Sequence, residues 1–283
     1  MALSIRRAFL SAVIAWTPCV AGCGLSVDVD EPIGGGGNDG GGSVSMTGNW
    51  VMHARCRGSV PPGTQPCRTQ FLTFSDSGES VKAYLDLDGD GTFAEAVSIA
   101  ATSASGGIRL KGDYNWDGTS YALDVLVWEF SWGYAAGDAI YRVGSGPNQP
   151  ETVTMVRIMN PPLHDLNGVW DIDQTLDWAT GGLSYLAGMT ESGVYQITQE
   201  MSGPMHGFFE AIRSDGECFT GIVNDTQITL ARRYEDYGWL WTYTYTNLNA
   251  DGDWFGGTHL GQAELGALQE DVGWSMVAYR TGQ

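Results

Sequence analysis

The sequence predicts an all-β fold of two tandem small β-barrels, which follow an export signal and a flexible glycine-rich tether. Two observations predict this architecture. A Gly-x-Trp motif ends at Trp50 and again at Trp170, 120 residues further on, and the triplet Thr-Met-Val at 154–156 returns as Ser-Met-Val at 275–277, 121 residues later. Short β-rich runs between Gly, Asn and Asp turns fill both halves of the chain. Landmarks in nearly constant register indicate a duplicated unit.

The expected strands are short runs rich in β-branched and aromatic residues, which are typical of small barrels or sandwiches. Helical patterns are weak, and the best of them, at 262–270, predicts one short helix before the last strand. The clearest strand runs are 70–74, 81–87, 108–111, 121–132, 194–201, 227–232 and 239–246.

Residues 1–22 have the order of an export signal. Arg6 and Arg7 come first, an apolar stretch follows at 8–16, and small residues lead to Gly22. The apolar stretch is well short of the roughly 20 residues that a helix needs to cross a bilayer, so this segment is not a transmembrane helix.

The quartet Val20-Ala21-Gly22-Cys23 at the end of the signal resembles the lipobox of bacterial lipoproteins. That resemblance implies that Cys23 becomes the first mature residue and carries acyl chains such as palmitate, which tether the protein to a membrane. Each buried methylene contributes about 0.8 kcal/mol, so several chains give stable attachment. In a bacterium with two membranes, Gly24 in place of Asp implies sorting to the outer membrane. The alternative is a secretory signal with a chance cysteine.

Glycine, serine and aspartate dominate residues 23–45, which cannot bury a core and are expected to form a flexible tether. The rest of the chain divides at Asn160-Pro161-Pro162, because consecutive prolines remove backbone donors and fix an extended connector. We therefore expect one barrel at 46–160 and a second at 161–283.

The formal net charge of −19 bounds the choice of partners. A chain this acidic is repelled by nucleic acid and by anionic lipid headgroups, so neither is expected to bind it. Cations, neutral sugars and basic partners remain compatible with this charge.

Three cysteines remain once the signal is removed and the lipid site is modified. Cys56 and Cys67 bracket a loop rich in proline and glycine, and in an oxidising compartment they are expected to form a disulfide worth about 2–3 kcal/mol. Cys218 is then left as a buried free thiol.

Each unit opens with its tryptophan on a first strand and closes with a strand that carries an arginine, Trp50 with Arg157 and Trp170 with Arg280. This arrangement resembles the calycins, the lipocalin and avidin-like barrels, in which the first-strand tryptophan packs under an arginine of the last strand. The resemblance implies cation–π stacking at the closed end of each barrel. Arg280 stands two residues beyond the place that the Met-Val landmark gives it, a shift that keeps the same strand face.

Residues 239–246 alternate between aromatic side chains and mostly threonine, which puts Trp239, Trp241, Tyr243 and Tyr245 on one face of a strand. One interpretation is a stacking platform for a sugar, or the wall of a cavity for an apolar ligand. The other is that the aromatic stripe fills the core of a small barrel.

Asp86, Asp88 and Asp90 form the run D-x-D-x-D-G, which opens many calcium-binding loops. The twelfth position is Val97 instead of glutamate, so this loop is not an EF-hand. The segment 247–253 repeats the rhythm in the second unit. The alternative for both segments is a pair of hairpin turns, for which Asp-Gly and Asn are favoured.

No serine-hydrolase, zinc-protease or phosphate-loop motif is present, and His53, His164, His206 and His259 are expected to be isolated surface or turn residues, so we expect no enzyme. The sequence thus predicts a lipid-anchored, non-catalytic cell-envelope protein that binds a small apolar or sugar ligand through a β-barrel. The alternatives are a calcium-stabilised β-sandwich that binds carbohydrate or builds the envelope and, more remotely, a hydrolase with dispersed carboxylates.

Overall fold

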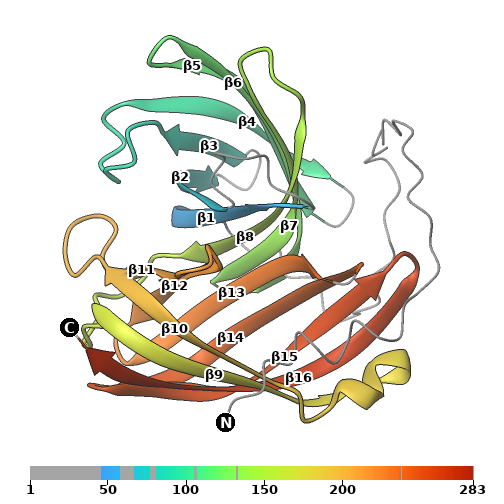
Figure 1. Cartoon of the computed structure of the whole chain (residues 1–283). Helices are drawn as coiled ribbons and strands as arrows, with labels where there is room; N and C mark the ends of the chain where they lie inside the picture. Colours follow the sequence, from blue (N-terminus) through green and yellow to red (C-terminus); the bar gives the residue numbers. More distant parts are fainter. Residues whose placement is uncertain are drawn as a thin grey trace. The chain divides into compact units, whose positions relative to one another are not determined.

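The computed structural model describes residues 46–57, 67–76, 81–104, 107–131, 133–236 and 238–282, and at 76, 103–104, 129–131 and 243–251 it describes the backbone alone. These residues form two closed antiparallel barrels (Figure 1). The predicted all-β class with two tandem barrels is therefore confirmed. In the described part of the chain, no helix is long and apolar enough to span a membrane.

Both barrels are simple meanders in which each strand pairs with the next and the last strand closes on the first. A short 3-10 helix, η3 (Gly181–Leu186), interrupts the second barrel after its first strand. The first barrel contains β1 (Gly48–Cys56), β2 (Cys67–Asp76), β3 (Val81–Asp86), β4 (Ala96–Ala104), β5 (Gly107–Trp116), β6 (Thr119–Ser131), β7 (Tyr134–Val143) and β8 (Gln149–Arg157). The second contains β9 (Gly168–Ala179), β10 (Thr190–Gln199), β11 (Phe208–Arg213), β12 (Cys218–Asn224), β13 (Gln227–Asp236), β14 (Trp239–Asp251), β15 (Trp254–Leu265) and β16 (Leu268–Gly282).

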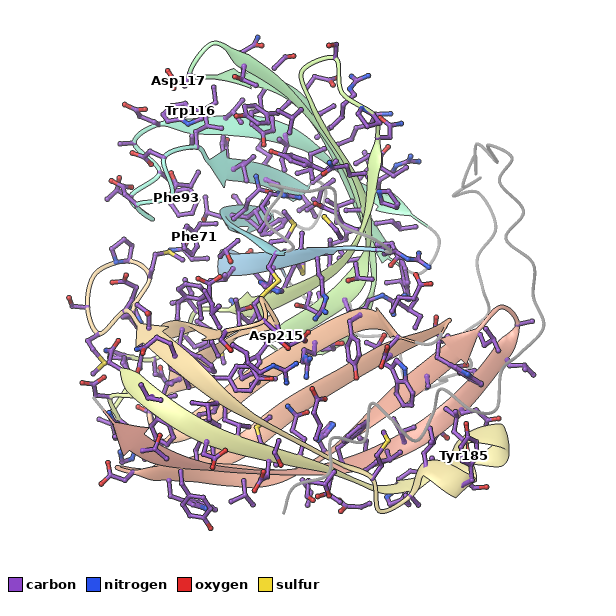
Figure 2. The ribbon with its side chains drawn as sticks, in the orientation of Figure 1. Phe71, Phe93, Trp116, Asp117, Tyr185 and Asp215 are labelled. Carbon is purple, nitrogen blue, oxygen red and sulfur yellow. A yellow bond between two sulfur atoms is a disulfide. The ribbon has the colours of Figure 1, made fainter. Side chains whose placement is uncertain are left out.

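Turn chemistry sets the ends of the strands. Asp117 and Gly118 form the two-residue turn between β5 and β6, and both have positive φ values, 47° and 73°. Aspartate and glycine tolerate that conformation, which this type of hairpin turn requires (Figure 2). The helix predicted at 262–270 is wrong, because this segment is the β15–β16 hairpin, with its turn at Gly266.

Each barrel repeats one arrangement around the tryptophan of its first strand. Trp50 lies opposite Arg157 and Trp170 lies opposite Arg280 in the strand register. The Trp170 indole nitrogen donates to the Leu166 carbonyl (2.7 Å), and the Trp50 nitrogen donates to the carbonyl four residues before it (2.8 Å). In the second barrel the Arg280 guanidinium lies 4.8 Å from the Trp170 ring, as the calycin resemblance implies.

An apolar cluster joins the outer walls of the two barrels. Phe71 of β2 meets Phe208 of β11 edge to face, with ring centroids 5.5 Å apart. The backbone passes from one barrel to the other through 158–167, and Ile158 of this connector belongs to the cluster, which we call the seam. The buried members of the cluster are Val51, Tyr134, Ala136, Val156, Ile158, Met205, Phe208, Ile222 and Ala231.

Candidate functional site

The predicted calcium run forms the loop between β3 and β4. Asp86 is the last residue of β3, and Asp88 and Asp90 follow in the turn. Carboxylate oxygens of the three residues lie within 4.8 Å of one another. Asp88 and Asp90 are exposed, whereas Asp86 is 4% exposed. The structure thus brings the three predicted ligands together around one buried carboxylate.

Asp86 is half satisfied by the protein. Its Oδ2 accepts a hydrogen bond from the Gly91 amide (2.7 Å), while its buried Oδ1 has no partner. Burial raises the pKa of Asp86, the Gly91 hydrogen bond lowers it, and the neighbouring carboxylates of Asp88 and Asp90 raise it, so that the pKa lies at about 6. A buried carboxylate with an unsatisfied oxygen is costly, and a proton or a cation at that oxygen would offset the cost.

The loop also packs against the second barrel. Gly91 has a φ of 74°, and a Cβ added to it would come within 2.2 Å of the Met205 side chain. Met205 belongs to the apolar cluster between the barrels. The conformation of the Asp86 loop is therefore coupled to the seam.

The twelfth position contributes nothing to this loop. Val97 lies in β4 opposite Leu85 and packs against the core, so it supplies no ligand. In the segment 247–253, Asp251 pairs with Trp254 at the end of a hairpin, and Asp253 forms an ion pair with Arg280 (3.0 Å). That segment is a hairpin turn in the structure, as the alternative interpretation held.

The aromatic strand is β14. Trp241 is 6% exposed and packs edge to face on Trp274, with ring centroids 6.2 Å apart. Trp239 is half-buried against the same core. Tyr243 and Tyr245 are described by their backbone alone, opposite Arg232 and Leu230 of β13. The described half of the stripe therefore fills the core instead of forming an outward platform.

Three polar side chains lie on the inner face of the second barrel, and sequence reasoning missed them. Gln174, Arg232 and His259 are 2%, 4% and 6% exposed. Each lies on the same face of its strand as a side chain of the core. The Arg232 guanidinium lies 4.7 Å from the Tyr234 ring, and the His259 ring is stacked on Trp274 at 6.4 Å. The period-two alternation of β9, β13 and β15 could have identified them.

The disulfide is not the predicted one. Cys67 bonds to Cys218 of the second barrel, and Cys56 is a free, half-buried thiol whose pKa is raised by burial. The prediction of a Cys56–Cys67 bond with Cys218 free was therefore wrong. The reason is strand geometry: Cys67 lies opposite Arg55, so Cys56 points to the other face of the sheet.

Charged groups surround this disulfide. Nη1 and Nη2 of Arg55 donate to the Glu217 carboxylate (2.5 and 2.8 Å), and Arg232 also donates to Glu217. Burial raises the pKa of Glu217, but Arg232 and Arg55 outweigh it and hold that pKa at about 2. Glu217 is therefore a charged bridge between a strand of the first barrel and the interior of the second.

Two histidines are buried, contrary to expectation. His53 is 5% exposed and His259 is 6% exposed. Burial, with the charges of Arg55 and Arg232, lowers the pKa of His53 to about 3. Its two ring nitrogens have no hydrogen-bond partner, and one of them lies within 4.8 Å of the sulfurs of Cys67 and Cys218.

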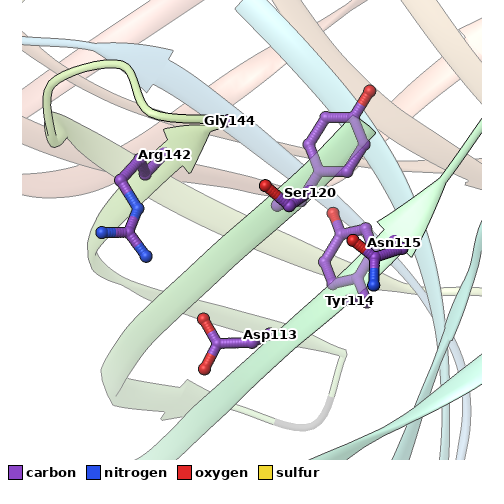
Figure 3. Close-up of a pocket in the computed structure, with 7 residues that line it drawn as sticks. Asp113, Tyr114, Asn115, Ser120, Arg142 and Gly144 are labelled. Atoms are coloured by element: carbon purple, nitrogen blue, oxygen red, sulfur yellow. The ribbon is translucent and has the colours of Figure 1, made fainter. Parts of the chain in front are cut away.

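A shallow hollow of about 210 Å³ lies at one end of the first barrel (Figure 3). Asp113 and Arg142 project into it from β5 and β7, on either side of Ala122. Both charged residues are exposed, so the hollow is an open polar dish. Its lining residues are Asp113, Tyr114, Asn115, Ser120, Tyr121, Arg142 and Gly144.

Comparison with known proteins identifies no family. No protein-family model matches the chain, and no curated protein matches it. A crystal structure of a protein of unknown function from the DUF3598 family of Nostoc punctiforme aligns with 11% identity and a TM-score of 0.24, over 83% of this chain and 96% of that chain.

Proposed function

We propose that this chain is a lipid-anchored, non-catalytic protein of the bacterial cell envelope, in which a calcium ion bound by the Asp86 loop fixes the first barrel against the second. The observation that supports calcium most directly is the buried Asp86 carboxylate, whose Oδ1 has no protein partner although two more carboxylates lie within 4.8 Å. Calcium prefers six to eight oxygen ligands in flexible geometry, so three carboxylates with water or backbone carbonyls suit it.

The ion would act on stability. Without it, three carboxylates are brought together beside a buried position, which raises the free energy of the folded state. With it, the loop holds Gly91 against Met205. Calcium would therefore support the seam between the barrels.

Adding calcium at a free concentration 100-fold above its dissociation constant is expected to stabilise the chain by about 2.7 kcal/mol, or roughly 5–10 °C in melting temperature. Asp88→Ala should lose most of this gain, because it removes a charged ligand. Thermal melts in chelator and in millimolar calcium measure both effects. Asp113→Ala is the matched control, since Asp113 is an exposed carboxylate of the same barrel outside the loop. If chelator leaves the melting temperature of both variants unchanged, the loop is a plain turn that binds no calcium.

Membrane attachment rests on the sequence, because residues 1–45 lie outside the described residues. The lipobox resemblance ending at Cys23 supports an acyl anchor, and Gly24 supports the outer membrane as its site.

Cys23→Ser is expected to abolish lipidation and to release the protein into the soluble fraction, because the thiol that carries the lipid is gone. Fractionation and intact mass report the two effects. Cys56→Ser, which removes a thiol of the folded body, should leave both unchanged. Equal membrane retention of Cys23→Ser, with no mass difference of acyl chains, would refute the anchor.

We also propose the second barrel as the place for a small ligand with an apolar body and an anionic or hydroxyl-bearing head. The supporting observation is that Arg232 and His259 face an interior rich in aromatic rings, which is the lining composition of small-molecule sites. Gln174 adds an amide to the same interior.

Arg232→Gln is expected to weaken binding of the fluorescent aromatic anion anilinonaphthalene sulfonate by about tenfold, equivalent to about 1.4 kcal/mol. Quenching of tryptophan fluorescence on titration measures it, and a parallel panel of monosaccharides tests the sugar alternative. Arg109→Gln is the control, because Arg109 pairs with Asp124 on the first barrel. Failure of both the anion and the sugars to saturate one site would argue against a ligand here.

A further inference from the structure

We propose that His53, Cys67 and Cys218 form a metal site of the reduced chain that takes a thiophilic cation, zinc(II) or copper(I). The three residues offer one nitrogen and two sulfurs that all lie within 4.8 Å of one another. Two cysteines and one histidine are the donor set of zinc sites, and soft thiolates also select copper(I). This site is separate from the Asp86 loop and independent of it.

The state of His53 points to a ligand. The side chain is 5% exposed, and neither Nδ1 nor Nε2 has a hydrogen-bond partner. Buried polar groups without partners are uncommon, because leaving them unpaired destabilises the folded state. Coordination of one ring nitrogen by a metal would remove part of that cost.

Strand geometry directs all three side chains into the seam. His53 lies on the same face of β1 as Val51 and Arg55, and Val51 is a member of the apolar cluster between the barrels. Cys67 lies opposite Arg55 and therefore shares that face. Cys218 lies on β12, on the face of Ile222, another member of the cluster.

The spacing suits a tetrahedral ion. With zinc–sulfur and zinc–nitrogen bonds of about 2.3 and 2.0 Å, ligand atoms lie roughly 3.5–3.8 Å apart. Once the sulfurs are no longer bonded, a small separation of Cys67 and Cys218 reaches that geometry. Three protein ligands leave one position for water or an outside ligand.

Reduction and metal binding would be sequential. A dithiol reductant gives two electrons and two protons to the Cys67–Cys218 bond, yielding two thiols while it becomes a disulfide itself. Zinc(II) then displaces the two thiol protons, and the two thiolates balance its charge. The disulfide and the metal are mutually exclusive, and either one ties β2 of the first barrel to β12 of the second.

Zinc titration of the full chain carrying Cys19→Ser and Cys23→Ser, reduced with a phosphine, tests the proposal. We expect the reduced chain to bind one zinc per folded molecule and the oxidised chain to bind none with the same affinity. When cobalt(II) replaces zinc, a thiolate-to-metal charge-transfer band should appear. His53→Asn should weaken zinc binding by roughly tenfold or more and alter the cobalt spectrum. Cys56→Ser, which removes the neighbouring free thiol, should bind zinc unchanged.

If variants of the cluster misfold, alkylation of the chain in which His53, Cys67 and Cys218 are unchanged still tests the proposal. Bound zinc should protect Cys67 and Cys218 from iodoacetamide and leave Cys56 reactive, as read by peptide mass spectrometry. The proposal is overturned if the folded reduced chain binds no stoichiometric zinc, if His53→Asn binds as tightly as the parent, or if protection falls on Cys56.

Discussion

Trp170→Ala is expected to lower the free energy of unfolding by about 3–5 kcal/mol, the cost of a large aromatic-to-alanine change in a core. Trp170 is fully buried, its indole nitrogen donates to Leu166, and its ring contacts Phe255 with centroids 4.9 Å apart. The substitution removes the ring, leaves a cavity in the core and removes the ring on which Arg280 is stacked. Urea unfolding followed by circular dichroism measures the loss.

Trp178→Ala is the matched control, because it removes the same side chain from the same strand at a position that is 42% exposed. Its cost should stay near 0.5 kcal/mol, as is usual for surface sites. Equal costs for the two variants would mean that Trp170 does not hold the core together.

The double variant Cys67→Ala/Cys218→Ala is expected to lose about 4–5 kcal/mol, because the bond closes a loop with a sequence separation of 151 and restricts the unfolded chain accordingly. Both cysteines are changed so that neither can pair with Cys56. Denaturant unfolding under non-reducing conditions gives the difference.

Cys56→Ala should change stability little in the same experiment, since this thiol forms no bond in the structure. Non-reducing peptide maps of the parent should join Cys67 to Cys218. A peptide that joins Cys56 to Cys67 would restore the pairing expected from sequence and contradict the structure.

The features that could be predicted were those that the local pattern determines. Alternation and turn residues gave the strands, and the duplicated Gly-x-Trp motif gave two barrels. The pairing of Trp170 with Arg280 could be predicted because a shift of two residues along a strand leaves a side chain on the same face. In the structure that shift is visible in register: Met155 lies opposite Met52, two residues after Trp50, whereas Met276 lies opposite Gln174, four residues after Trp170.

The predictions that were wrong concerned features that depend on tertiary contacts. Cys56 and Cys67 are near in sequence, but strand pairing turns them to opposite faces, and the partner of Cys67 comes from the other barrel. Burial of His53 could not be read from sequence, because the surface that covers it belongs to a second domain. The helix expected at 262–270 was wrong because Gly266, in the middle of that segment, forms the turn of the β15–β16 hairpin.

The Asp86 loop lies between these cases. The spacing of its three carboxylates predicted a candidate calcium site, and the structure brings these carboxylates together. The burial of Asp86, with one oxygen that has no hydrogen-bond partner, could be seen only in the folded structure.

If the proposed acyl anchor holds the N-terminal end, the Cys67–Cys218 bond has a mechanical consequence. A pulling force that enters at β1 can extend the chain only as far as Cys67 before it crosses the sulfur–sulfur bond to Cys218 and continues toward the C-terminus. The 151-residue separation between the two cysteines then bears no load, which withholds roughly 500 Å of contour length from extension. Reduction of that single bond would release this hidden length, so the redox state of the seam sets how far a tethered molecule can stretch.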